Sequence, residues 1–199
     1  SYRGQILVST YPLIGNYGVP SKQVDSNNIP LFYESDQVQV SGLIVSDYSF
    51  EYSHWNAEKS LADWFKEHKI PGVFGIDTRA LTKKLRESGT MLGKLVFDNQ
   101  DVPLFDPGVE NVVAEVSVNE PVIYGNGSRK VVLVDCGVKN NIIRCFLKRD
   151  TQVIRVPWDY DFTAMDYDGL FISNGPGNPE TLAKTVENIE YSQITGTPN

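Results

Sequence analysis

Cysteine, histidine and basic residues are all scarce in this chain. Its 199 residues include two cysteines and two histidines, and 18 Lys and Arg residues against 25 Asp and Glu residues, which gives a formal net charge of −7. Cys136 and Cys145 form no paired CxxC motif and have no histidine cluster beside them, which argues against a disulfide framework and against a zinc site. A sequence pI near 4.8 argues against nucleic acid as a partner, because acidic surfaces repel phosphate backbones.

Long apolar runs are also missing. No segment approaches the roughly 18 consecutive apolar residues that a membrane span requires, and the first residues lack the basic and then apolar order of a secretory signal. The hydrophobic content of 41% is nevertheless high enough for one large or two small domains with a core. We therefore expect a cytoplasmic globular protein with no membrane partner.

The first part of the chain mixes strand and helix patterns. A helix over residues 78–88 is indicated by Asp77 or Thr78 as its cap, by Leu81 and Leu85 on one face, and by Gly89 just beyond its end. A second helix is expected from Ser53, a good N-cap, to residue 68. Expected strands cover residues 4–11, ending at Pro12, and residues 38–45, 73–76 and 91–97, with loops at 12–25 and 100–108.

Composition changes between residues 119 and 130, where glycine, proline and serine interrupt any periodicity and indicate a domain boundary. An apolar strand over residues 131–135, a helix over 140–149 and a strand over 152–156 then predict a βαβ unit. Residues 169–172 predict a third parallel strand, and a helix is expected from Glu180. Three strands are fewer than the five or so of a doubly wound sheet, so we expect this α/β domain to be incomplete in the chain.

The loop at residues 173–179 (SNGPGNP) follows the strand at 169–172 directly. Glycine permits close approach and positive φ, so Gly175 and Gly177 are candidates to point their amides at a carbonyl group or a developing oxyanion. The carboxyl ends of parallel strands are also where open α/β sheets bind ligands. The alternative is a tight turn without function, because glycine and proline often only punctuate a chain.

Several segments together resemble the small, glutamine-hydrolysing subunit of carbamoyl-phosphate synthase. The resemblance covers nearly the whole chain, in the family's order. It rests on residues 5–8 (QILV), 10–18 (TYPLIGNYG), 75–82 (GIDTRALT), 135–141 (DCGVKNN) and 173–179 (SNGPGNP).

The resemblance implies a β-rich α/β domain at residues 1–128, lacking its start, and the first part of a flavodoxin-like class I glutamine amidotransferase domain at residues 129–199. It implies hydrolysis of glutamine to glutamate and ammonia. The ammonia would pass to a large synthetase subunit that uses ATP, Mg²⁺ and bicarbonate, whereas no cofactor or metal is expected in this chain. The product would feed arginine and pyrimidine synthesis. Ser1, Gly175 and Gly177 match the family's contacts to the substrate glutamine.

The family's nucleophile is a cysteine in a Gly-x-Cys-x-Gly turn, supported by a His and a Glu, and we expect this triad beyond Asn199. Cys136 does not fit that role, because valines take the places of the small flanking residues and Asp135 would raise the thiol pKa. Cys136 and Cys145 are therefore predicted to be structural. His54 and His68 are predicted to lie at helix ends, without a catalytic role.

Two other functions stay open at this stage. The chain could be a non-catalytic module that docks on a large subunit, with exposed aromatic residues around Tyr48, Tyr52 and Trp55 as the candidate surface. It could also be a flavodoxin-like nucleotide binder, although it has neither a Gly-x-Gly-x-x-Gly nor a Walker pattern. For the glutamine-hydrolysing function, we expect Gly175→Val to remove most glutaminase activity from the intact protein while leaving its folding largely unchanged.

Overall fold

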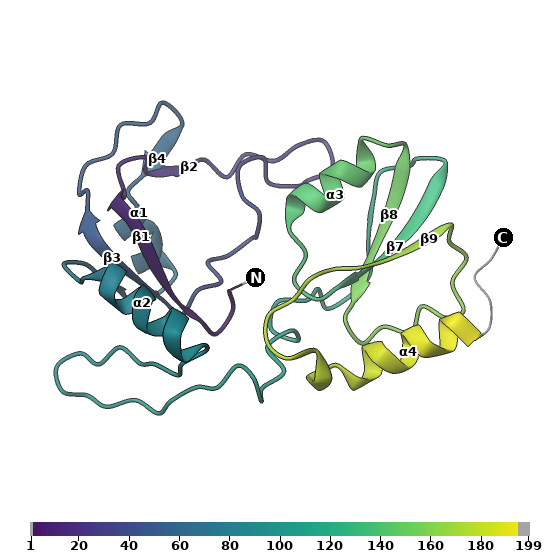
Figure 1. Cartoon of the computed structure of the whole chain (residues 1–199). Coiled ribbons are helices and arrows are strands. Elements are labelled where there is room, and N and C mark those ends of the chain that lie inside the picture. The colour runs from purple at the N-terminus through teal and green to yellow at the C-terminus, as the bar shows by residue number, and fades with distance from the viewer. Residues whose placement is uncertain (1, 195–199) are drawn as a thin grey trace. The chain divides into compact units, whose positions relative to one another are not determined.

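The structure is a computed structural model that describes the backbone of residues 2–194 and side chains up to residue 192. The chain packs into two compact units that are interleaved in sequence. The N-terminal unit consists of Tyr2–Gln23 and Asp36–Asp106, and the C-terminal unit consists of Val24–Ser35 and the chain from Pro107 onward. Both contain helices and parallel sheet (Figure 1), so the predicted α/β class is confirmed.

The N-terminal unit is built on a three-stranded parallel sheet in the order β1-β3-β5. The first strand does not stop at Pro12 as predicted, because a shift of register between Ser9 and Leu13 lets it continue beside its neighbour. A separate antiparallel pair joins β2 to β4. The strands are β1 (Ile6–Ile14), β2 (Val19–Pro20), β3 (Gly42–Tyr48), β4 (Ala57–Lys59) and β5 (Gly72–Val73).

Helix α1 (Leu61–Glu67) covers one side of this sheet, with Phe65 in a core that includes Leu43 and Val45. The predicted start of this helix at Ser53 is wrong, since residues 57–59 pair as a strand instead. Ser60 is the actual N-cap, because its hydroxyl oxygen accepts the Asp63 N–H at 3.0 Å and so satisfies one free donor of the first turn.

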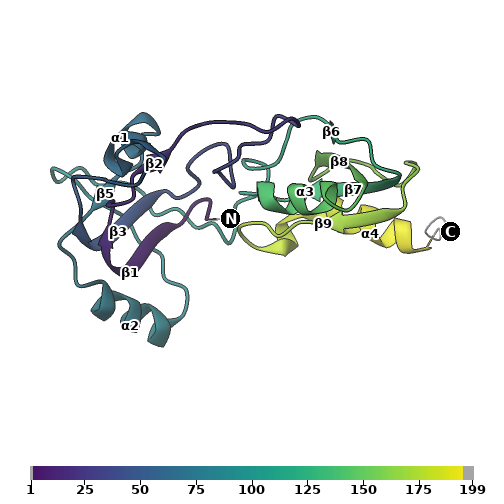
Figure 2. The same cartoon turned by 90° about the horizontal axis from the view of Figure 1, so that it is seen from above.

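Helix α2 (Thr78–Ser88) lies on the other side of the sheet (Figure 2). Its predicted bounds are confirmed, with Asp77 as the cap whose carboxylate accepts the Ala80 N–H at 2.9 Å and Gly89 at the end with φ of 76°. The strand predicted at residues 91–97 is wrong, since that segment forms only an isolated bridge between Phe97 and Gln100. Its apolar side chains find no neighbouring strand and remain largely exposed.

The C-terminal unit contains a four-stranded sheet in the order β6-β8-β7-β9, parallel except for β6. The predicted βαβ unit and third parallel strand are therefore confirmed, whereas β6 falls in the segment predicted as a linker. The elements are β6 (Val122–Tyr124), β7 (Arg129–Asp135), α3 (Asn140–Leu147), β8 (Thr151–Pro157), β9 (Gly169–Ile172), a short 3₁₀ turn (Pro179–Thr181) and α4 (Ala183–Ile194).

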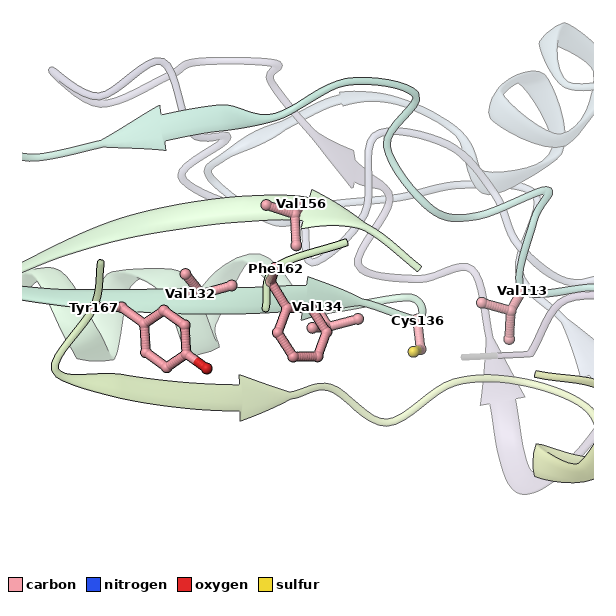
Figure 3. Close-up of a cluster of buried hydrophobic side chains, with 7 residues drawn as sticks. All are labelled: Val113, Val132, Val134, Cys136, Val156, Phe162 and Tyr167. Atoms are coloured by element: carbon pink, nitrogen blue, oxygen red, sulfur yellow. The ribbon is translucent and has the colours of Figure 1, made fainter. Parts of the chain in front are cut away.

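The two helices of this unit cover opposite faces of the sheet, because successive strand residues point to opposite sides. Leu133 packs with Ile143 of α3, whereas its neighbours Val132 and Val134 pack in a cluster with Ile189 of α4. Figure 3 shows part of this second cluster, with Cys136 beyond the end of the strand that carries the two valines. Burial on both faces explains why β7 appears in the sequence as a continuous apolar run.

Residues 24–35, here called the strap, pack with the C-terminal unit although their neighbours in sequence belong to the other one. Ile29 is 2% exposed and lies in the cluster of Leu133 and Ile143. Glu34 pairs with Arg144 of α3, with 2.8 Å between Oε1 and Nη2. The compact units are thus interleaved in sequence, and the domain division at residue 128 stays a prediction.

No helix among the described residues is long and apolar enough to cross a membrane.

Candidate functional site

The glycine loop, residues 173–179, leaves the carboxyl end of β9 beside the end of β7. Two hydrogen bonds connect the ends of these strands. The Ser173 N–H donates to the Val134 carbonyl at 3.1 Å, and the Cys136 N–H donates to the Ser173 hydroxyl oxygen at 2.9 Å. Ser173 is 6% exposed, so the base of the loop is fixed by buried polar contacts.

Gly175 and Gly177 are both exposed, whereas Pro176 between them is buried. Within the described part of the chain, the N–H groups of these two glycines donate no hydrogen bond. The loop borders a hollow of about 390 Å³ that is also lined by Cys136, by Ile172 and by Val186 of α4. Free amide donors beside a hollow suit a ligand that carries a carbonyl or carboxylate oxygen.

The backbone at both glycines lies too close to its neighbours for a side chain. A Cβ at Gly175 would overlap the carbonyl oxygen of Cys136, and one at Gly177 would lie 2.8 Å from a methyl carbon of Val112, at a φ of +75° that favours glycine. The expectation that Gly175→Val leaves the fold undisturbed is therefore wrong. Both glycines are required by packing, whatever else they do.

Cys136 is 3% exposed and packs with Val113 and Val134. Burial and then the charge of Asp135 raise the pKa of its thiol to about 11. A thiol in this state is almost wholly protonated near neutral pH and is a poor nucleophile. The prediction that Asp135 raises this pKa is confirmed, and the buried position agrees with a structural role.

Asp135 is fully buried at the end of β7 and is surrounded by donors. Its Oδ1 accepts the N–H groups of Gly137 and Val138, and its Oδ2 accepts the Val118 N–H and pairs with Arg155 at 2.7 Å. Burial lowers the pKa of the Arg155 guanidinium, but the Asp135 charge and hydrogen bonds outweigh burial and raise it overall. This network holds the β7 end against β8 and the chain near residue 118.

The remaining described candidate residues of the sequence analysis do not line the hollow beside the glycine loop. Ser1 lies outside the described residues, so its predicted contact stays a prediction. Cys145 is half-buried. His68 is the C-cap of α1, as predicted, whereas His54 precedes β4 and is not at a helix end. Among the described residues, no group of three His, Cys, Asp or Glu side chains could hold a metal ion.

Sequence reasoning missed two residues that support the glycine loop. Val112 and Val113 are each 1% exposed, and they lie where side chains at Gly177 and Gly175 would have to go. They belong to a valine-rich segment, residues 109–118 (VENVVAEVSV), that forms turns and no regular strand or helix. Its apolar pattern signals burial, but it does not signal a contact with the glycine loop.

Comparison with known protein families matches both parts of the chain. Residues 1–95 match the carbamoyl-phosphate synthase small chain, CPSase domain, and residues 132–198 match the glutamine amidotransferase class-I family. The chain is of the carbamoyl-phosphate synthase small-subunit type. The predicted resemblance is therefore confirmed, and the glycine loop lies within the segment that matches the amidotransferase family.

Individual carbamoyl-phosphate synthases and multifunctional proteins are similar over nearly the whole chain. "Carbamoyl-phosphate synthase [ammonia], mitochondrial" of Rattus norvegicus is 48% identical over 192 residues, which are 96% of this chain and 13% of that protein. "Multifunctional protein CAD" of Squalus acanthias is 48% identical over 96% of this chain and 9% of its own length. "Multifunctional protein ura1" of Schizosaccharomyces pombe is 43% identical, again over 96% of this chain. The chain thus spans only about an eighth or less of these relatives.

Proposed function

We propose that this chain supplies the glutamine-binding loop of a glutamine-dependent carbamoyl-phosphate synthase. The observation that carries the proposal is that Gly175 and Gly177 are exposed, line a hollow, and have N–H groups with no acceptor among the described residues. Glutamine offers two fitting acceptors, its side-chain carbonyl and its α-carboxylate. Donors fixed before the substrate arrives stabilise negative charge that develops on an oxygen at little reorganisation cost.

The nucleophile for this reaction is expected beyond Asn199, in a cysteine turn with a supporting His and Glu. Cys136 is a poor substitute, because its thiol is buried and its pKa is raised to about 11. In this proposal the described residues bind and orient glutamine, and the chemistry at its amide carbon depends on residues outside the printed sequence. Ser1 is proposed as a further glutamine contact.

The proposed partner is a large synthetase part, separate or fused, which would use the released ammonia with bicarbonate, ATP and Mg²⁺. The product would serve arginine and pyrimidine synthesis in the cytoplasm. Trp55 is 85% exposed and Tyr52 is 39% exposed. Large aromatic side chains are enriched at protein interfaces, which supports these two residues as part of the docking surface on the N-terminal unit.

A second candidate is a non-catalytic role in a synthase that takes free ammonia. The name of the rat relative specifies ammonia, and neither cysteine of the present chain is placed as a nucleophile. In that case the same loop would be a structural remnant of an amidotransferase.

The two functions differ in the nitrogen source that the synthase can use. The natural protein in which this chain occurs would be assayed for carbamoyl phosphate with glutamine or with ammonium chloride as the only nitrogen source, together with glutamate release. We expect synthesis and glutamate release with glutamine. Synthesis from ammonium chloride with neither synthesis nor glutamate release from glutamine would refute the glutamine-dependent function and favour the second candidate.

A matched pair of variants tests the site itself. Val186 is exposed and lines the hollow, whereas Ala183 is exposed on the same helix and does not line it. Val186→Asp places a carboxylate beside the bound substrate and is expected to raise KM for glutamine about tenfold, because it repels the α-carboxylate of glutamine. Ala183→Asp adds the same charge elsewhere and should leave KM unchanged. Equal kinetics in the two variants would place glutamine elsewhere.

A further inference from the structure

Helix α2 presents a concentrated positive charge on a chain that is acidic as a whole. Arg79, Lys83 and Arg86 are exposed on this helix and, together with Thr82 and with Thr10 of β1, line a hollow of about 320 Å³. The three cationic residues follow a spacing of four and then three, which places them on one face of a helix. None of the described carboxylates lines this hollow.

These charges are poorly compensated within the N-terminal unit. The guanidinium groups of Arg79 and Arg86 make no hydrogen bond or ion pair within the described part of the chain, and the Lys83 Nζ lies 4.0 Å from its exposed neighbour Glu87. Like charges three and four residues apart oppose each other, and a cation in the first helical turn, such as Arg79, opposes the helix dipole. Arg86 lies in the last turn, where a cation suits the dipole, so an anion at the hollow would relieve chiefly the repulsion at Arg79 and Lys83.

The groups at the hollow are suited to an oxyanion. Two guanidinium groups and one ammonium group are donors only, and guanidinium groups form paired hydrogen bonds to phosphate. The Thr82 hydroxyl already donates to the Thr78 carbonyl at 2.8 Å, whereas the Thr10 hydroxyl makes no hydrogen bond among the described residues. The hollow can therefore offer an anionic group four donor groups of three kinds: two guanidinium groups, one ammonium group and the Thr10 hydroxyl.

We propose that the hollow between α2 and β1 binds the phosphate groups of a small phosphorylated molecule. Arg79 and Arg86 are seven residues apart, about 10 Å along the helix, so the cations can contact a ligand with more than one phosphate group. The grouping of donors around a small hollow favours a compact ligand over an extended acidic protein surface. This site belongs to the N-terminal unit and is independent of the proposed glutamine loop.

The test is a calorimetric titration of the full 199-residue chain with inorganic pyrophosphate in a buffer free of divalent cations. The informative variant is Arg79→Gln with Arg86→Gln. The matched control is Lys84→Gln, which removes an exposed charge from the same helix but does not line the hollow. We expect the double variant to weaken binding by about tenfold or more and the control to change it by less than about twofold.

Three results would overturn the proposal. One is the absence of binding tighter than about 1 mM in the unaltered chain. Another is an equal loss in the Lys84→Gln control, because this would show a diffuse charge effect and not a site. The third is binding of an oligoglutamate peptide through Arg79 and Arg86 where pyrophosphate fails, which would assign the surface to an acidic protein partner.

Circular dichroism of each variant tests whether it is folded. Thr10→Val provides a second, uncharged substitution at the hollow that is expected to weaken binding.

Discussion

The backbone N–H of Cys136 donates a hydrogen bond of 2.9 Å to the side-chain hydroxyl oxygen of Ser173, 37 residues further along the chain. Both residues are buried. The same hydroxyl lies 3.2 Å from the Asn174 carbonyl oxygen, so it can accept from one strand end and donate to the glycine loop. One small side chain thus ties the loop to its sheet.

Replacing Ser173 with alanine should destabilise the fold. The Cys136 N–H would lose its acceptor in a buried place, which costs about 1–3 kcal/mol. Urea unfolding of the full chain measures this change in the free energy of unfolding. Ser53→Ala is the control, because Ser53 is exposed and its side chain makes no hydrogen bond among the described residues. Equal stability of the two variants would contradict the assigned contact.

Alanine at Gly175 should also destabilise the fold, because its Cβ would overlap the Cys136 carbonyl oxygen. Overpacking of this kind costs about 1–3 kcal/mol. Gly93 provides the comparison, since a Cβ there meets nothing within 4 Å, and Gly93→Ala should be neutral or slightly stabilising. The difference in thermal midpoint between the two variants measures the effect. Equal thermal midpoints for Gly175→Ala and Gly93→Ala would contradict the close contact between Gly175 and the Cys136 carbonyl oxygen.

Asp135→Asn should be the most damaging of these substitutions. It leaves the Arg155 guanidinium buried without its counter-charge, which costs about 3–5 kcal/mol. Glu187→Gln breaks the exposed pair of Glu187 with Lys184 and should cost less than about 1 kcal/mol. Chemical denaturation of both variants tests the contrast, and similar small losses would mean that Asp135 and Arg155 are not coupled.

The raised pKa of Cys136 makes stability depend on alkaline pH. The thiol has an ordinary pKa of 9.0 in the unfolded chain and about 11 in the folded one. The folded state therefore holds a proton that the unfolded state has released, so this contribution is complete below pH 9 and is lost as the pH rises to about 11. The advantage of the unaltered chain over Cys136→Ala should shrink across this interval.

Alkylation provides a second measurement for the same thiol. At pH 8, iodoacetamide should modify the half-buried Cys145 well before Cys136, as peptide mass spectrometry would show. Rapid modification of Cys136 in the folded chain would contradict its protection.

The C-terminal unit was largely predictable because its signals are local. Strand β7 is buried on both faces and therefore appears as an unbroken apolar run, and α3 has a clear apolar stripe. The start of α1 was missed because Ser53 and Ser60 are both acceptable caps, and only pairing of residues 57–59 with β2 decides between them. Local pattern cannot supply that information.

The glycine loop shows how much of the candidate site can be predicted from the sequence. Its sequence indicates where a ligand could bind and which amides are available. It does not indicate that Gly175 lies against Cys136, or that Val113 and Val112 fill the space beside Gly175 and Gly177. These contacts join segments far apart in the chain. The cost of a side chain at Gly175 follows only from those contacts.

The strap has a consequence for synthesis on the ribosome. Ile29 is made about a hundred residues before Leu133 and Ile143, the side chains that bury it. Domains generally fold as they emerge, starting from the N-terminus, but the core around Ile29 cannot close until α3 has been made. Until residue 143 has been translated, the side chain of Ile29 therefore stays exposed to water, even if the N-terminal sheet has already formed. A chaperone that binds exposed apolar segments could therefore bind the strap in the nascent chain, whereas Ile29 is buried in the folded protein.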